Sequence, residues 1–216
     1  MSTGAKAAVQ VRSKDTRDRL LAALDGLLKE KAFESVTVTE IAGRAGVSPA
    51  TIYQRFNNRD AAIAILIELY MRRVAEWSRS PAGAVDYRAA TSLREALRMV
   101  ALAAWRQFDE LGYLMRPAYL YSRLRPDLIG EQWDVMQAQA VQGFASLLTA
   151  FPNELAAGVA AKSAGTIAYF FNVMFLGRLL HPDAPVGPKM TAKRFAEELA
   201  TFACGYLSQQ GASATS

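Results

Sequence analysis

TVTEIAGRAGVSPATIYQRF, residues 37–56, is the segment from which the fold can be predicted most directly. Thr37 and Glu40 have the spacing of a capping box, in which each side chain binds the backbone N–H of the other residue. A helix should therefore begin at Val38. Gly46 follows the apolar residues of this helix and gives the backbone the freedom that a tight turn requires. The first half of the segment predicts a short helix followed directly by a turn.

The second half of the segment predicts another short helix. Ser48 can cap it, and Pro49 suits its first position because the N–H that proline lacks has no partner there. Ile52 and Phe56 are four residues apart and should share the inner face. The outer face is then formed by Ala50, Thr51, Gln54 and Arg55. Two capped helices with a glycine at the joint match the helix-turn-helix that enters a DNA major groove; the alternative is a helical hairpin that only packs in an all-α core.

The region from Arg17 to about Met71 resembles the N-terminal DNA-binding domain of the tetracycline-repressor (TetR) family. The matching positions, in fixed register, are Leu20, Leu21, Ala23, Leu27, Leu28, Phe33, Thr37, Val38, Ile41, Ala42, Ala45 to Ser48, Thr51 to Tyr53, Phe56 and Arg59. Three positions depart from the family pattern. Ala32 replaces a preferred glycine, so the loop there should differ in shape. Arg55 stands where the family often has His or Tyr, and Arg59 stands where it often has Lys. Both arginines keep or raise the positive charge.

The resemblance implies that the second helix of the motif enters the major groove of a double-stranded DNA operator. Gln54 can bind adenine through two hydrogen bonds, Arg55 can bind guanine in the same way, and the Thr51 methyl group suits thymine. Other residues of the motif are suited to phosphates, which fix the register without reading sequence. The predicted DNA-contacting residues are Thr37, Thr39, Arg44, Ser48, Pro49, Ala50, Thr51, Tyr53, Gln54, Arg55 and Arg59.

Composition and charge agree with a DNA-binding end. The chain has 216 residues, of which 51% are apolar and 21% charged, as expected of a globular protein. Of the net charge of +5, most lies near the N-terminus: residues 1–73 hold 12 Lys and Arg against 8 Asp and Glu, and the remainder holds 13 against 12. Attraction to DNA phosphates requires an excess of this kind.

The residues that catalysis or metal binding would need are absent from the pattern. His181 is the only histidine and lies in a proline-rich loop, and Cys204 is the only cysteine, which excludes an internal disulfide. No glycine-rich phosphate loop follows a strand pattern. We therefore expect neither enzyme activity, nor a cofactor, nor a metal. No apolar run reaches the ~20 residues that cross a bilayer, and Met1–Gln10 lacks a secretory segment, so a cytoplasmic protein without a membrane partner is expected.

Helical periodicity continues on both sides of the motif. A first helix should begin at Asp15 or Thr16, after a flexible arm over residues 1–14. A stiff helix should run from Arg59, capped by Asn58, to about Ser78. The small and turn-forming residues Ser80–Gly83 then mark a break.

The remainder shows no strand pattern and no internal repeat, so the predicted fold is all-α. A helix that includes Leu93 should end near Gly112, before an irregular piece between Arg116 and Pro126. Further helices are expected over Asp127–Ala150, Glu154–Leu180 and Thr191–Leu207. The predicted domains are a three-helix helix-turn-helix domain over residues 15–62 and a helical bundle for ligand binding and dimerisation over residues 63–216.

The roles of the second domain are those that the resemblance implies: in TetR-like proteins the middle helices hold an inducer and the last two long helices pair across a two-fold axis. Aromatic and methionine side chains with interspersed polar groups suggest an apolar pocket, although ordinary core packing explains any single one. The predicted pocket residues are Trp105, Phe108, Tyr113, Tyr119, Tyr121, Trp133, Met136, Gln137, Tyr169, Phe170, Asn172 and Met174. The predicted dimer interface comprises Ala160, Ala164, Ala168, Phe171, Phe195, Leu199 and Phe202.

The function predicted from these features is a homodimeric, ligand-responsive transcriptional repressor that a small apolar or aromatic effector releases from a palindromic operator. Two alternatives stay open from the sequence. One is a TetR-like activator, and the other is a helical small-molecule carrier or scaffold that does not bind DNA.

Overall fold

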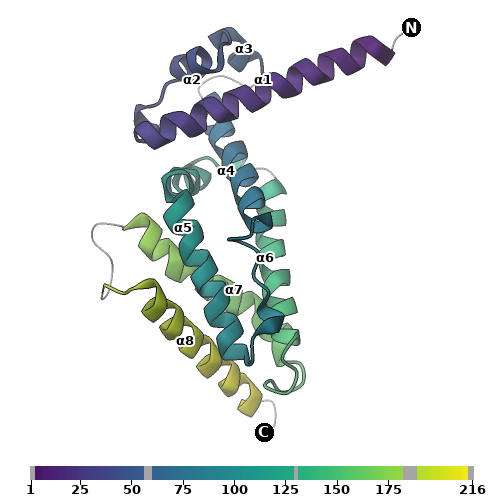
Figure 1. Ribbon diagram of the computed structural model, residues 1–216, viewed down its shortest axis with the longest axis vertical. Coiled ribbons are helices and arrows are strands. Elements are labelled where there is room, and N and C mark those ends of the chain that lie inside the picture. The colour runs from purple at the N-terminus through teal and green to yellow at the C-terminus, as the bar shows by residue number, and fades with distance from the viewer. Residues whose placement is uncertain (1–2, 56–59, 129–130, 182–188, 214–216) are drawn as a thin grey trace. The chain divides into compact units, whose positions relative to one another are not determined.

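The structure is a computed structural model that describes residues 3–55, 60–128, 131–181 and 189–213. Within these ranges every regular element is a helix, which confirms the predicted all-α fold. The elements are α1 (Thr3–Glu30), η1 (Phe33–Ser35), α2 (Val38–Ala45), α3 (Pro49–Arg55), α4 (Ala61–Arg79), η3 (Tyr87–Ala89), α5 (Leu93–Leu124), η4 (Pro126–Leu128), α6 (Glu131–Thr149), α7 (Val159–Leu180) and α8 (Ala192–Ser213), where η marks a short 3₁₀ helix (Figure 1).

The chain divides into two compact units, each containing residues from separate parts of the sequence. Residues 1–76 and 113–130 form the first unit, and residues 77–112 and 131–216 form the second. The predicted boundary at residues 62 and 63 falls inside α4, and the chain passes from one unit to the other within α4 and α5. Continuous helices leave no linker at which a sequence pattern reveals a boundary.

The two predicted helices of the motif form α2 and α3. The capping box is present: the Glu40 N–H donates to Thr37 Oγ1 at 3.2 Å, and the Thr37 N–H donates to Glu40 Oε2 at 2.9 Å. Gly46 ends α2 in the left-handed conformation with φ 65°, where a side chain would be strained. Ser48 Oγ accepts from the Thr51 N–H at 3.3 Å, so the predicted cap of α3 is also confirmed.

Helix α1 packs on α2 and is much longer than predicted. The expected start at Asp15 or Thr16 is wrong, because the helix already begins at Thr3, within the segment expected to be a flexible arm (Figure 1). After Gly4 the segment contains no glycine or proline, and extending an existing helix by one residue is far easier than starting one. The buried apolar residues that the structure describes in α1 to α3 are Leu20, Leu21, Ala23, Leu24, Leu27, Leu28, Ile41, Ala42, Ala45 and Ile52.

Helix α5 continues through the segment expected to be irregular. The predicted end near Gly112 is wrong, since α5 runs to Leu124 with Pro117 inside it. An interior proline removes a backbone hydrogen bond and costs roughly 3 kcal/mol. Burial offsets this cost, because Leu114 and Ala118 on either side are fully buried and the Tyr121 ring meets Phe33 edge-on at 4.9 Å, all within the first unit.

The second unit is a helical bundle around one apolar core. Residues 93–112 of α5 pack with α6, α7 and α8 (Figure 1). Its most deeply buried members include Ala96, Leu97, Ala101, Leu147, Leu148, Val159, Ala164, Ile167, Phe171, Phe175, Ala196, Leu199, Ala200 and Ala203. Helix α7 begins at Val159 rather than near Glu154, because Gly158 has the left-handed φ of 80° that interrupts a helix.

By length and composition, α7 is long and apolar enough to span a membrane, although the sequence suggested no such segment. In this protein one side of α7 packs in the core of the second unit, where Ile167, Phe171 and Phe175 are buried. A core helix of a globular protein passes the same test of length and composition, so this helix is weak evidence for a membrane span.

Candidate nucleic-acid interface and ligand cavity

The helix-turn-helix presents one face to the core and leaves the other exposed. Ile52 of α3 is fully buried, whereas the neighbouring Tyr53 side chain is 46% exposed and Thr51 is half-buried. The other predicted contact residues with exposed side chains are Thr37, Thr39, Arg44, Ser48, Pro49 and Ala50. The side chains of Gln54 and Arg55, and the residues Phe56, Asn58 and Arg59, lie outside the part that the structure describes, so the roles predicted for them stay predictions.

Arg44 is held by α1 rather than free to extend from α2. Its guanidinium donates two hydrogen bonds to the Glu30 carboxylate, from Nη1 at 2.8 Å and from Nη2 at 2.5 Å. It also lies over Gly26, where an added Cβ would meet the guanidinium carbon at 3.2 Å. These hydrogen bonds raise the pKa of Arg44 and lower that of Glu30. Any DNA contact by Arg44 therefore competes with Glu30.

Charged groups also stabilise both ends of α2. Lys31 Nζ donates to Glu40 Oε1 at 2.5 Å, and this bond, together with the two bonds from Thr37, lowers the pKa of Glu40 to about 2. At the other end, Arg19 Nη1 donates to the Ala45 carbonyl at 3.1 Å. A carboxylate near the first turn and a cation near the last turn both suit the helix dipole. The helix that precedes the turn is thus fixed on α1.

A buried carboxylate connects α1, α4 and α5 within the first unit. Asp25 is 5% exposed; its Oδ1 accepts from the Tyr113 hydroxyl at 2.6 Å, and its Oδ2 accepts from Arg73 Nη2 at 2.6 Å and from Lys29 Nζ at 2.9 Å. Burial raises the pKa of Asp25, but the three donors outweigh it and hold the pKa below its usual value. Burial and the hydrogen bond to Asp25 raise the pKa of Tyr113. Sequence reasoning missed Asp25, because a lone Asp on a helix looks like a surface residue.

The side chains predicted to line a single pocket are divided between the two units. Tyr113, Tyr119 and Tyr121 belong to the first unit, and the other nine belong to the second. Tyr169 is 63% exposed, and Asn172 and Met174 are also exposed. Trp105 and Phe108 pack in the bundle, on Phe195 and Phe175. The two pockets described below contain none of these residues. The prediction failed because aromatic content alone does not show which face of a helix is covered.

The second unit contains a largely apolar cavity of about 380 Å³ that is lined by residues other than the predicted ones. Its walls come from the end of α4 and the following segment (Trp77, Ser78, Gly83, Val85 and Tyr87), from α5 (Val100, Ala103, Ala104 and Gln107) and from α6 (Ala140, Gly143, Phe144 and Leu147). Small residues on the facing helices leave the space, and this pattern is the sequence signal that was overlooked.

Gly83 fixes one wall of this cavity. A Cβ at this position would lie 2.1 Å from the Trp77 carbonyl oxygen and 2.5 Å from Trp77 Cε3, so only glycine fits. The Ser80 hydroxyl donates to the same carbonyl at 2.7 Å, and the Gly83 N–H donates to Ser80 Oγ at 3.2 Å. The predicted break at residues 80–83 is therefore a tight turn packed on Trp77.

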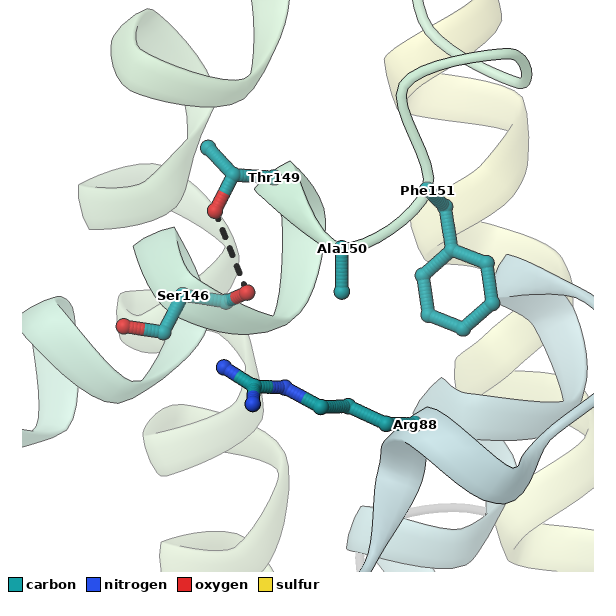
Figure 2. A pocket seen from close by; sticks show the side chains of 5 residues that line it. All are labelled: Arg88, Ser146, Thr149, Ala150 and Phe151. Carbon is teal, nitrogen blue, oxygen red and sulfur yellow. Dashed lines mark hydrogen bonds between the residues drawn. The ribbon is translucent and has the colours of Figure 1, made fainter.

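A second pocket, of about 370 Å³, is more polar. Figure 2 shows Arg88 extending beneath the last turn of α6, with Ser146, Thr149, Ala150 and Phe151 around it. Thr149 Oγ1 donates to the Ser146 carbonyl at 3.1 Å. A guanidinium near the carbonyl end of a helix is favourable by itself. Helix-end stabilisation thus accounts for this arrangement without a ligand.

The predicted dimer interface is mostly inside the second unit and is corrected by the structure. Ala164 and Leu199 are 1% and 2% exposed, and Phe171 is also buried; only Phe202 of the predicted set is clearly exposed, at 44%. Ala164 and Ala168 of α7 are buried in their own bundle rather than exposed to solvent. The exposed apolar face instead comprises Tyr169, Val173 and Met174 of α7 with Phe202 of α8.

Aromatic contacts join the two helices of this exposed face, which lie side by side in Figure 1. Phe170 meets Phe202 edge-on at 5.2 Å and Tyr206 at 6.4 Å, and Tyr169 packs against Phe170 at 5.8 Å. We refer to Tyr169, Phe170, Val173, Met174, Phe202 and Tyr206 as the α7–α8 face. Exposed apolar faces of this kind mark interaction sites in globular proteins.

Among the described residues, no group of three or more His, Cys, Asp or Glu side chains is arranged to hold a metal ion. The Cys204 thiol is half-buried in α8, and burial raises its pKa, which makes it a poor nucleophile. The geometry of the chain therefore offers an exposed helix-turn-helix, a cavity and an apolar face.

Comparison with known proteins gives two kinds of similarity. Residues 20–63 match the family described as "Bacterial regulatory proteins, tetR family". The uncharacterized HTH-type transcriptional regulator YdeS of Bacillus subtilis (strain 168) is 48% identical over 52 residues, which are 24% of this chain and 26% of YdeS. The sequence similarity to YdeS thus spans only about a quarter of that protein.

Solved structures extend the similarity of fold to most of the chain. A transcriptional regulator from Rhodococcus sp. Rha1 has a TM-score of 0.60 at 17% identity, covering 90% of this chain and 96% of that one. PfmR, a TetR family transcriptional regulator from Thermus thermophilus, has 0.55 at 17%, covering 87% and 97%. The fatty acid degradation regulator FadR from Bacillus halodurans has 0.54 at 16%, covering 87% and 94%.

Proposed function

Because residues 20–63 match the tetR family of bacterial regulatory proteins and most of the chain shares the fold of known regulators, we propose that this chain is a TetR-family DNA-binding transcriptional regulator of the cytoplasm that acts as a repressor. One observation carries the proposal: α2 and α3 are capped, fixed on α1 and exposed along one face. A helical hairpin used only for packing needs no such exposed face with hydroxyl and basic groups. The basic excess of residues 1–73 supports the same proposal.

Recognition of the operator divides between two kinds of contact. The exposed side chains of Thr37 and Tyr53 are suited to phosphates, and the α3 residues Gln54 and Arg55 to base edges. Arg55→Ala should weaken binding by about 1–3 kcal/mol and relax the preference at one base position. An unchanged affinity and an unchanged site preference in gel shifts would mean that Arg55 does not read a base.

The regulator is proposed to act as a homodimer that pairs through the α7–α8 face. Two copies related by a two-fold axis present two α3 helices, which suit a palindrome with half-sites one or more helical turns apart. Pairing through this face would remove exposed apolar side chains such as Tyr169, Val173 and Phe202 from water, which stabilises a dimer. A substitution at Ala164 is no test of this interface, because Ala164 is a core residue of the bundle.

An effector in the cavity is proposed to weaken operator binding through α4. This helix carries Trp77 and Ser78, which line the cavity, and four residues before Trp77 it carries Arg73, which binds Asp25 of α1. Coupling of about 1–3 kcal/mol changes affinity roughly 5- to 150-fold. An effector switches the operator only if it binds the DNA-competent and DNA-free arrangements with different affinity.

The decisive experiment is selection of random oligonucleotides with the purified full-length protein. The proposal predicts an enriched palindrome whose affinity falls steeply between low and moderate salt, as counterion release requires. If no sequence is enriched and no duplex binds at low salt, the DNA-binding proposal is wrong. The remaining cavity would then favour a small-molecule carrier. Repression and activation are separated by placing the selected palindrome upstream of a reporter gene.

A further inference from the structure

We propose that the cavity beside Trp77 takes an uncharged aromatic molecule that carries one neutral hydrogen-bonding group, recognised by Gln107 and Tyr87. This proposal rests on the proposed function, because it takes this cavity to be the effector site. The walls of the cavity indicate the chemistry of the effector.

Charge limits what the cavity can accept. The described residues that line the cavity include no Asp, Glu, Lys or Arg. Burying an ionised ligand without a partner of opposite charge is strongly unfavourable. Two charged side chains near the lining residues already have partners: Glu110 accepts from Trp77 Nε1 at 3.2 Å, and Arg106 donates to the Ala82 carbonyl at 3.4 Å. The lining therefore disfavours carboxylates, phosphates and ammonium groups.

Two polar groups of the lining are available to a ligand. Gln107 and Tyr87 line the cavity, and neither side chain forms a hydrogen bond with another residue in the part of the chain that the structure describes. The amide of Gln107 can both donate and accept, as can the Tyr87 hydroxyl. A hydroxyl or carbonyl on the ligand would therefore find a partner of either kind.

The shape of the cavity suits a small aromatic molecule. Trp77 and Phe144 provide aromatic walls, while Ala103, Ala104 and Gly143 leave open space between them. Gly83 packs on Trp77 and fixes its position. A volume of about 380 Å³ lies at the small end of the roughly 300–1,000 Å³ typical of ligand sites. A compact ring system fits these walls better than a long flexible chain.

Three probes of nearly equal shape test the proposal with the full-length protein: 4-phenylphenol, biphenyl and biphenyl-4-carboxylate. The phenol is neutral near pH 7, because phenols titrate near pH 10. In isothermal titration we expect 4-phenylphenol to bind about 2- to 13-fold more tightly than biphenyl, the fold-change of one hydrogen bond of about 0.5–1.5 kcal/mol. The carboxylate should bind at least about tenfold more weakly than the phenol, because no cation among the described lining residues balances its charge and the apolar walls replace part of its water.

Variants locate the site and separate recognition from unfolding. Gln107→Leu keeps the approximate volume and should reduce the preference for the phenol over biphenyl, with biphenyl binding unchanged; Tyr87→Phe should reduce it in the same way. Ala104→Trp fills the cavity and should abolish binding of both. Thermal unfolding of each variant without probe checks that it folds. Arg88→Ala tests whether any bound carboxylate sits in the second pocket instead.

The proposed chemistry is overturned if biphenyl-4-carboxylate binds as tightly as 4-phenylphenol in the Arg88→Ala variant, if Ala104→Trp binds the probes unchanged, or if none of the probes binds. A failure of the proposed ligand chemistry can be distinguished from a failure of the proposed regulatory function. Operator binding without probe binding refutes the ligand chemistry alone. Probe binding in the expected order that leaves operator affinity unchanged supports the ligand chemistry and refutes the coupling.

Discussion

Replacing Tyr113 with Phe removes one hydroxyl from the buried network around Asp25 and leaves the ring. Asp25 Oδ1 loses its 2.6 Å donor, while Oδ2 keeps Arg73 and Lys29. A hydrogen bond to a charged group contributes about 1.5–3 kcal/mol, and Asp25 is only 5% exposed, so water replaces the lost donor poorly. We therefore expect Tyr113→Phe to lower the free energy of unfolding by about 2 kcal/mol at neutral pH.

The pH dependence of this difference follows from the two pKa shifts. The pKa of Asp25 is lowered in the folded state, so its contribution is present above the ordinary value of 3.8 and is lost as the pH falls through the folded-state pKa. The pKa of Tyr113 is raised, so its contribution is present below the ordinary value of 10.0 and is lost as the pH rises above it. The difference in unfolding free energy between wild type and Tyr113→Phe should therefore be constant between pH 3.8 and pH 10.0, and it should become smaller at more acidic and at more alkaline pH.

Urea denaturation at equal protein concentration is the appropriate assay, because the proposed dimerisation would make the apparent stability depend on protein concentration. Tyr87→Phe is the matched control: the Tyr87 hydroxyl has no hydrogen-bond partner in the described part of the chain, so its loss should change stability by less than about 0.5 kcal/mol. If Tyr113→Phe changes stability at neutral pH no more than the control does, the argument for a stabilising Asp25 network is wrong.

Three further predictions concern the motif, the apolar face and the turn. Thr37→Ala removes the cap of α2 and should cost about 1 kcal/mol in unfolding free energy, measured by urea denaturation, whereas Thr37→Ser should restore it. If the proposed dimer pairs through the α7–α8 face, Val173→Arg should make the protein sediment as a monomer without lowering its helix content; a variant that still sediments as a dimer would place the interface elsewhere. Gly83→Ala should shift the Trp77 backbone and weaken binding of 4-phenylphenol. Gly165→Ala is the control: it lies in α7 outside the cavity lining, its added Cβ meets no atom within 4 Å, and it should leave binding unchanged.

The local structure of the motif was predictable because short-range chemistry determines it. The capping box of Thr37 and Glu40, the left-handed Gly46 and the Ser48 cap each act within a few residues. The all-α class followed from periodicity in the same way. Where the competing interaction was tertiary, prediction failed: α5 continues past Pro117 because the flanking turns are buried in the first unit.

Capping groups, periodicity and residues with special backbone freedom are local properties, and they were enough to predict the helix-turn-helix, the all-α class and the position of the tight turn. Which apolar residues face solvent, a partner or a cavity became known only from the packed helices. Ala164 and Val173 are both apolar residues of α7, yet one is 1% and the other 44% exposed. Burial depends on which helices pack against α7, and no local pattern contains that information.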